Sequence, residues 1–179
     1  MVPLDTAPAA VIGVAEAQVA ALEDRLWAGV PDDDLVDGVA AVERLKARLA
    51  ALQAGLLAEV DARDLAKKQL AWGSTTDWYT HLAGVTRREG RRTVADAVTL
   101  TTERPATLAA LREGHTSPAQ ASIICAAVKA LPGSPALRDH GEQVLLEESR
   151  RLNATELART ARHLVEVVDP DRTERRLGR

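Results

Sequence analysis

Residues 42–56 read VERLKARLAALQAGL, and this segment decides the fold class of the chain. Its large apolar residues are separated by alternating steps of three and four, the spacing of the a and d positions in a coiled-coil seam. They are Val42, Leu45, Leu49, Leu52 and Leu56. The seam ends at Glu59, and Asp32-Asp33-Asp34 suits the positive end of a helix dipole. The sequence therefore predicts one long helix over about residues 33–68.

Two arrangements of this helix are open. It is either a central strut whose seam packs against shorter helices of the same chain, or its seam pairs with a second copy to form a homodimer. Two to three heptads are short for an independent coiled coil, so we favour packing within the chain.

Four motifs mark further helix starts. Each begins with Ser, Thr or Asn and has an acidic or amide residue three positions later, as in a capping box. They are Ser74-Thr75-Thr76-Asp77, Thr86-Arg87-Arg88-Glu89, Ser117-Pro118-Ala119-Gln120 and Asn153-Ala154-Thr155-Glu156. With the glycines and prolines between them, they predict helices near 75–83, 87–101, 118–131 and 154–168, and shorter ones near 105–113 and 135–151.

The composition also indicates an all-α fold, an irregular bundle built around the long helix. The chain is rich in Ala and Leu and has no Phe, and no segment shows the alternation of a strand. At 179 residues it can form one core, which we expect to be Leu-based. We expect a flexible arm over 1–13, a single helical domain over 14–170 that opens with a helix at 14–28, and a basic tail or linker over 171–179.

A dense basic cluster occupies the start of the helix predicted at 87–101. Four of six residues are arginines, Arg87, Arg88, Arg91 and Arg92, in a chain whose net charge is -3. Residues 1–64 carry 12 acidic and 5 basic side chains, whereas residues 65–179 carry 14 acidic and 18 basic ones. The two parts either attract each other, which we favour, or the basic part meets double-stranded DNA.

Two helix–turn–helix-like corners are predicted, around Gly84 and Gly114. In the DNA-binding form of this motif the second helix enters the major groove. Both corners depart from the template, because Gly90 and Thr93 in the first and Gln120 in the second stand where buried apolar residues are expected. The arginines favour a DNA-binding role for the first corner, since Arg88, Arg91 and Arg92 share one helix face.

Neighbouring residues extend this hypothesis. Lys67 and Lys68 either enlarge the basic surface or cap the end of the long helix. Trp72, Trp78 and Tyr79 either stack on bases or, as we favour, anchor the helix at 75–83 in the core.

We expect no enzyme activity, no metal site and no cofactor. The four histidines are isolated in the sequence, Cys125 is the only cysteine, and no phosphate loop or nucleophile motif occurs. No small-molecule substrate is indicated. The absence of a secretory signal, of a long apolar run and of disulfide-forming cysteines predicts a cytoplasmic protein with no membrane partner.

Several short segments, taken in order, resemble a known family. They are AEVDAR at 58–63, WYTHLAG at 78–84, the arginine helix, LREGHTS at 111–117 and EESRRL at 147–152. Over about residues 35–172 the chain resembles the actinobacterial 13E12-repeat family, also described as domain of unknown function 222. Many members carry an HNH nuclease module after the helical region, which implies a DNA-related context.

This chain has no His-Asn-His constellation and stops near the point where the helical region would continue toward the nuclease. Nuclease activity is therefore not carried over to any residue here. The leading hypothesis is a non-enzymatic helical module of a DNA-processing protein that contacts DNA through its arginines. The alternative is a protein-interaction or dimerisation module that uses the leucine seam.

Overall fold

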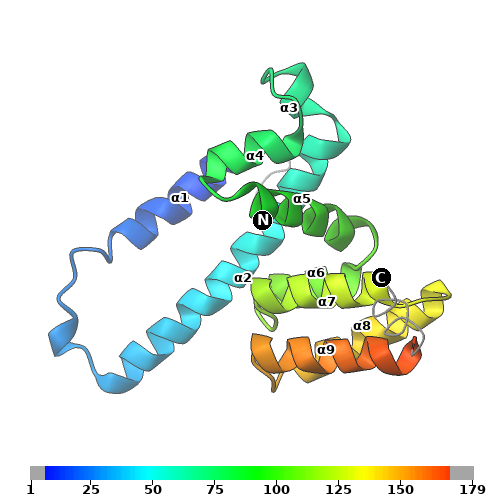
Figure 1. The fold of residues 1–179 in the computed structure, drawn as a ribbon. Coiled ribbons are helices and arrows are strands. Elements are labelled where there is room, and N and C mark those ends of the chain that lie inside the picture. Colours follow the sequence, from blue (N-terminus) through cyan, green and yellow to red (C-terminus); the bar gives the residue numbers. More distant parts are fainter. Residues whose placement is uncertain (1–6, 170–179) are drawn as a thin grey trace. The chain divides into compact units, whose positions relative to one another are not determined.

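The computed structural model describes residues 7–169, and all regular secondary structure among them is helical (Figure 1). The all-α prediction is confirmed. In chain order the elements are α1 (Pro8–Ala20), a 3₁₀ helix η1 (Trp27–Gly29), α2 (Asp32–Ala62), α3 (Leu65–Lys68), α4 (Thr75–Ala83), α5 (Arg87–Thr102), α6 (Pro105–Glu113), α7 (Pro118–Ala130), α8 (Pro135–Ser149) and α9 (Ala154–Val168).

The chain divides into two units, residues 1–40 and residues 41–179. In the first unit no residue of α1 is buried, and the Arg25 guanidinium lies 5.9 Å from the centre of the Trp27 ring. The second unit contains the hydrophobic core. The predicted single domain over 14–170 stays a prediction, and the predicted basic tail lies outside the described residues.

The predicted helix starts are confirmed by their caps. Thr86, Ser117 and Asn153 each form a complete capping box with the Glu or Gln three residues later. At α4 the Ser74 hydroxyl accepts a hydrogen bond from the Asp77 amide and donates one to its carboxylate. Each cap satisfies backbone amides that have no partner inside the helix, so these starts are fixed by local chemistry.

Two predicted helices have different bounds. The helix expected over 14–28 begins at Pro8, inside the segment expected to be a flexible arm, and ends at Ala20. Proline suits the first turn of a helix, and the Ala-rich stretch after it has high helix propensity. The helix expected over 33–68 is broken at Asp64, whose φ of 56° is left-handed. Aspartate tolerates this conformation better than most residues, and α3 starts directly after it.

The packing face of α2 overturns the arrangement that we favoured from the sequence. Its buried residues are Ala47, Ala51, Ala54 and Leu57. The seam side chains Val42, Leu45, Leu49, Leu52 and Leu56 lie on the other side and are 53, 40, 46, 44 and 39% exposed. The core thus meets α2 through small alanine side chains, and the leucines are left at the surface.

Among the other helices of residues 41–169, α4 packs against α5, and α7 packs against both α8 and α9 (Figure 1). Helix α6 contacts α5, α7 and α8. Helix α7 serves two core clusters. Ala121 and Cys125 join the cluster formed with α2, α4, α5 and α6. Ile124 and Val128, on the adjoining part of its surface, join the cluster formed with α8 and α9. Helix α7 therefore connects the two clusters of this unit.

Helices α4 and α5 meet at a glycine. A Cβ atom at Gly90 would lie 2.0 Å from the Thr80 hydroxyl oxygen and 3.3 Å from the Thr80 Cα atom. The position therefore excludes larger residues, because the backbone of α4 itself is close. Gly90 thus fixes how closely the arginine helix lies against α4.

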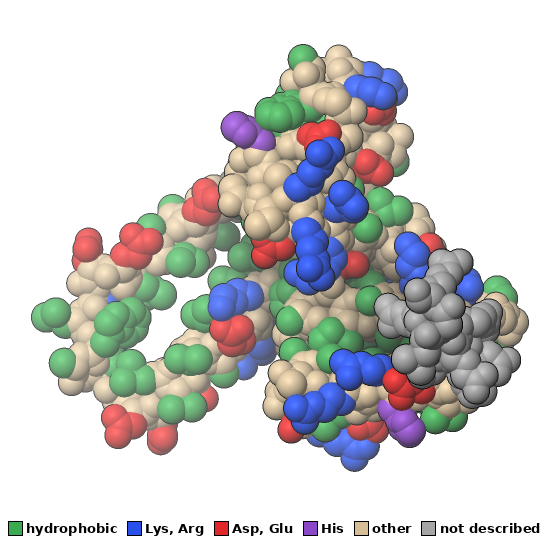
Figure 2. All heavy atoms as spheres, viewed as in Figure 1, with side chains coloured by type: hydrophobic (Ala, Val, Ile, Leu, Met, Phe, Trp, Pro, Cys, Tyr) green, Lys and Arg blue, Asp and Glu red, His purple; other side chains and the backbone are tan. Residues whose placement is uncertain are grey.

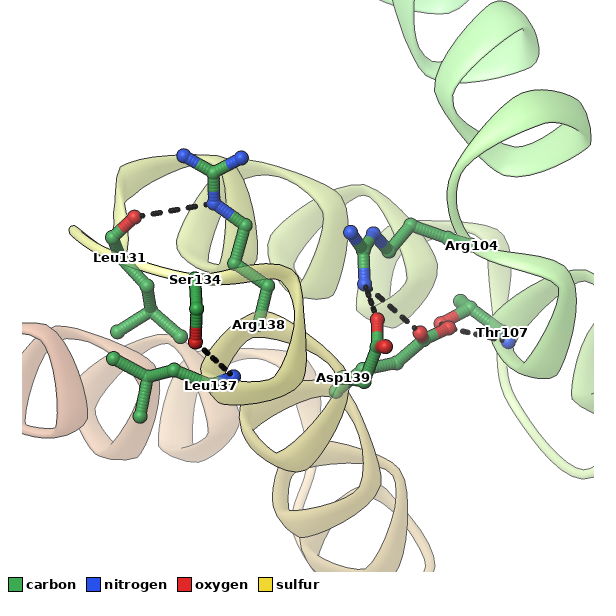
Figure 3. A network of polar contacts seen from close by, with 8 residues as sticks. Arg104, Thr107, Leu131, Ser134, Leu137, Arg138 and Asp139 are labelled. Carbon is green, nitrogen blue, oxygen red and sulfur yellow. Dashed lines mark hydrogen bonds and ion pairs between the residues drawn. The ribbon is translucent and has the colours of Figure 1, made fainter.

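A buried polar network connects α6 with α8. The Arg104 Nη1 atom lies 3.0 Å from Asp139 Oδ1 (Figure 3) and 3.2 Å from Glu142 Oε2. The other oxygen of Glu142 accepts hydrogen bonds from the Thr107 amide, at 2.9 Å, and from the Thr107 hydroxyl, at 2.6 Å. Because Arg104 itself provides no side-chain cap, this carboxylate from α8 caps the start of α6.

Replacing Gly90 by alanine tests the close contact between α4 and α5. We expect Gly90→Ala to lower the free energy of unfolding by about 1–3 kcal/mol, because the new Cβ forces the helices apart. Gly55→Ala in α2 is the matched control, since no atom lies within 4 Å of its added Cβ. The control should raise stability by about 0.5–1 kcal/mol, as glycine weakens a helix. Urea unfolding gives both values, and equal effects would contradict the packing.

Removing the Glu142 carboxylate tests the buried network. We expect Glu142→Ala to destabilise the protein by about 3–5 kcal/mol, since it leaves the buried Arg104 with only the exposed Asp139 as an ion-pair partner and leaves Thr107 uncapped. Glu147→Ala breaks an ion pair with Arg150 whose side chains are 70 and 68% exposed, so it should change stability by less than about 0.5 kcal/mol. Thermal and urea unfolding measure the difference, and a mild effect of Glu142→Ala would show that the network stabilises little.

Candidate nucleic-acid interface

At two corners a short turn with a left-handed glycine joins consecutive helices. Helix α4 ends at Gly84, whose φ is 62°, and three residues separate it from α5. Helix α6 ends at Gly114, whose φ is 78°, and four residues separate it from α7. After each glycine the next amide bonds back into the preceding helix, from Val85 to the Thr80 carbonyl and from His115 to the Ala110 carbonyl. Both helices therefore end in a Schellman motif, in which glycine takes the left-handed position.

The residues that depart from the motif template have structural roles. Gly90 is buried and permits the contact with Thr80, while Thr93 is half-buried. Gln120 completes the cap of α7, and its side-chain amide donates to the carbonyls of Ser149 and Leu152, at 2.8 Å each. The second corner is thus joined to the loop between α8 and α9, whereas the start of α5 faces solvent.

All four predicted arginines are exposed on the first two turns of α5. Arg87 forms an ion pair with Asp77 of α4, in which Nη2 and Oδ1 are 3.3 Å apart. Its side chain is still 73% exposed, so this pair contributes little to stability. Within residues 41–169 no ion pair joins the acidic residues before Leu65 to these arginines. The attraction between the acidic and basic parts of the whole chain stays a prediction.

Two carboxylates accompany Arg92. The pKa of Glu89 is lowered by hydrogen bonds from the Thr86 hydroxyl and amide and, to a smaller extent, by the charge of Arg92. The pKa of Asp96 is raised by burial, which outweighs the hydrogen bond from Ser122 and the charge of Arg92. The sequence analysis did not include Asp96, although its spacing of four residues from Arg92 places the two on one helix face.

Arg88 and Arg91 differ from the other two arginines. Among residues 7–169, neither lies within ion-pair distance of a carboxylate. They are one turn apart and exposed, so both guanidiniums reach the same surface. Figure 2 shows Lys and Arg side chains gathered over α4 and α5. This pair is the strongest feature of the candidate interface.

The two predicted lysines lie in the last turn of α3, and both are exposed. The Lys68 ammonium donates a hydrogen bond of 2.9 Å to the Arg63 carbonyl, close to the end of α2. It therefore acts as a cap for that helix, one of the two roles expected from the sequence. Lys67 has the exposure that a phosphate contact needs, and its part in binding stays a prediction.

The aromatic residues belong mainly to the core, as expected. Tyr79 is 8% exposed and lies in the first core cluster, and Trp78 packs against that cluster. Trp72 is half-buried, and its ring centre is 5.0 Å from that of His81. These two rings border an open hollow of about 440 Å³ that also includes Arg87 and Asp77. The hollow gives the arginine helix one adjacent surface with aromatic character.

The described residues contain neither a cluster of metal ligands nor a helix that could span a membrane. Within residues 7–169 no group of three or more His, Cys, Asp or Glu side chains is placed to hold a metal ion. In the same range no helix is long and apolar enough to span a bilayer. Cys125 is buried beside Asp96 and Glu142.

These observations define a class of protein: an all-helical module with an arginine-bearing, helix–turn–helix-like corner. The chain belongs to the family described as Domain of unknown function (DUF222), whose model matches residues 37–179. The match includes both corners and most of α2. No curated protein and no solved structure matches the chain.

Burial of Cys125 gives a prediction about pH. Desolvation, together with the nearby carboxylates, raises the pKa of its thiol from 9.0 to about 12. Below pH 9 the thiol is neutral in both the folded and the unfolded state, so its contribution to stability is fully present. Between pH 9 and 12 only the unfolded thiol ionises, and the free energy of unfolding falls as the pH rises.

Alkylation of Cys125 measures this effect directly. We expect almost no reaction of the folded protein with iodoacetamide at pH 8 and full reaction in denaturing urea, because the thiolate is the reactive form. Cys125→Ala should flatten the fall in stability between pH 9 and 12. Rapid alkylation of the folded protein would contradict the burial of this side chain.

Proposed function

We propose that this chain is a non-enzymatic DNA-binding module, and that Arg88 and Arg91 contact the phosphate backbone of double-stranded DNA. The observation that carries the proposal is the pair of exposed guanidiniums on the second helix of a glycine-turned corner. Among residues 7–169 neither has a carboxylate at ion-pair distance. Backbone contacts by Arg supply most of the affinity in non-specific DNA binding.

The four arginines have unequal roles in this proposal. Arg88 and Arg91 bind phosphate without first giving up a protein partner. Arg87 exchanges the Asp77 carboxylate for phosphate, and the charge of Arg92 is partly offset by Glu89 and Asp96. Lys67 and Lys68 extend the contact along the same unit. Because the whole chain has a net charge of -3, binding depends on this local surface and not on overall attraction.

The biological setting follows from the family resemblance. The module works in the cytoplasm and places a DNA-processing protein, of the kind with an HNH nuclease, on its substrate. In this proposal the nuclease carries out the chemistry, and the helical module positions it on DNA. Phosphate contacts carry no sequence information, so the module increases residence on DNA and leaves the choice of site to other elements.

A salt titration tests the proposal. We expect a labelled DNA duplex to bind in fluorescence anisotropy with an affinity that falls steeply as salt rises. The Arg88→Ala/Arg91→Ala variant should reduce the slope of log K against log salt by about 1.8, at about 0.9 for each phosphate that the variant no longer neutralises. Arg87→Ala and Arg92→Ala should each weaken binding less.

The matched control is Arg159→Ala/Arg162→Ala in α9. These arginines are also exposed and also three residues apart, so the variant has the same charge change on another helix. It should retain the salt slope of the unmodified chain. Equal losses of DNA affinity in the two double variants would show that binding depends only on net charge. Absence of binding at low salt would reject the proposal.

A further inference from the structure

The exposed seam of α2 is an apolar surface that the core of residues 41–169 leaves unpartnered. Five large aliphatic side chains, each at least 39% exposed, follow one another along four turns of a single helix. Figure 2 shows hydrophobic side chains at the surface along α2. Contiguous apolar surface of this kind marks an interaction site more often than isolated exposed leucines do.

The spacing of the leucines indicates what binds there. Leu45, Leu49, Leu52 and Leu56 are separated by four, three and four residues. This spacing is symmetric about the midpoint between Ala50 and Ala51. An antiparallel copy of the same helix, related by a two-fold axis at that midpoint, places Leu45 opposite Leu56 of the other copy and Leu49 opposite Leu52. Every leucine then has a leucine partner, as a two-fold interface between identical chains requires.

The charged residues beside the seam also suit this arrangement. In the antiparallel register Lys46 lies at the level of Gly55 of the other copy and Arg48 at the level of Gln53, so like charges do not oppose each other. In a parallel pair, the three aspartates in the first turn of α2 would lie beside their own copies.

We propose that two copies of this chain associate through the Leu45–Leu56 face of α2 in an antiparallel, two-fold symmetric coiled coil. The alanine face of the same helix packs inside each protomer, and the leucine face packs between protomers. Beyond the four leucine layers the same two-fold axis places Val42 opposite Glu59 of the other copy, so the apolar contact ends there. The inference is independent of DNA binding.

Sedimentation equilibrium tests the association. We expect a reversible monomer–dimer equilibrium that Leu49→Glu/Leu52→Glu shifts by at least about a hundredfold in concentration, because it brings four carboxylates together in an apolar contact. The control is Leu70→Glu/Leu82→Glu, which changes two leucines that are 46 and 65% exposed outside the seam. It should leave the equilibrium unchanged. Since all four positions are exposed, circular dichroism should show that both variants stay folded.

Cysteine cross-linking tests the orientation. A copy with Leu45→Cys should form a disulfide with a copy that carries Leu56→Cys, and each variant alone should cross-link poorly. The native Cys125 is buried and does not compete. Preferred cross-links between identical positions would overturn the antiparallel arrangement. A monomer at every concentration, as when α1 of the same chain covers the seam, would overturn the proposal altogether.

Discussion

Close packing through small side chains is the constraint on which the rest of this structure depends. The chain has no Phe and only one Met, so its helices cannot fill a wide core. Small residues fill many of the buried positions instead, such as Ala51 of α2, Ala97 of α5 and Ala121 of α7, all at most 2% exposed. Small residues at a contact shorten the distance between helix axes. The core is therefore narrow, and each helix buries only one part of its circumference.

This constraint determines which residues are left for binding. On α2 the alanines pack inward and the leucines face solvent. On α5, Gly90 packs against Thr80 while the arginines around it stay exposed. The buried charges of α6 and α8 satisfy each other, since Glu142 neutralises Arg104 and also caps α6. The two candidate surfaces, one basic and one apolar, thus lie on helices whose opposite sides form the core.

Local features of the fold could be predicted from the sequence, and the choice between helix faces could not. Capping side chains act within four residues, so the starts of α4, α5, α7 and α9 were correct. The break at Asp64 was missed because aspartate permits a left-handed conformation without requiring it. The seam was expected in the core because leucine is more apolar than alanine. Which face packs is decided by the shape of the partner helices, and that information lies far away in the sequence.

The candidate site was also predictable only in its local features. The arginine positions and their common helix face were predictable from spacing alone. Their individual surroundings were not, because the pairing of Arg87 with Asp77 requires the turn at Gly84 to bring α4 beside α5.

Urea unfolding of Ala51→Leu, compared with Ala41→Leu at an exposed position of the same helix, tests the packing face of α2 most directly. The account predicts a loss of about 1–3 kcal/mol for Ala51→Leu and less than about 0.5 kcal/mol for Ala41→Leu. A neutral or stabilising Ala51→Leu would contradict it, because the alanine face would then not be the face that α2 buries.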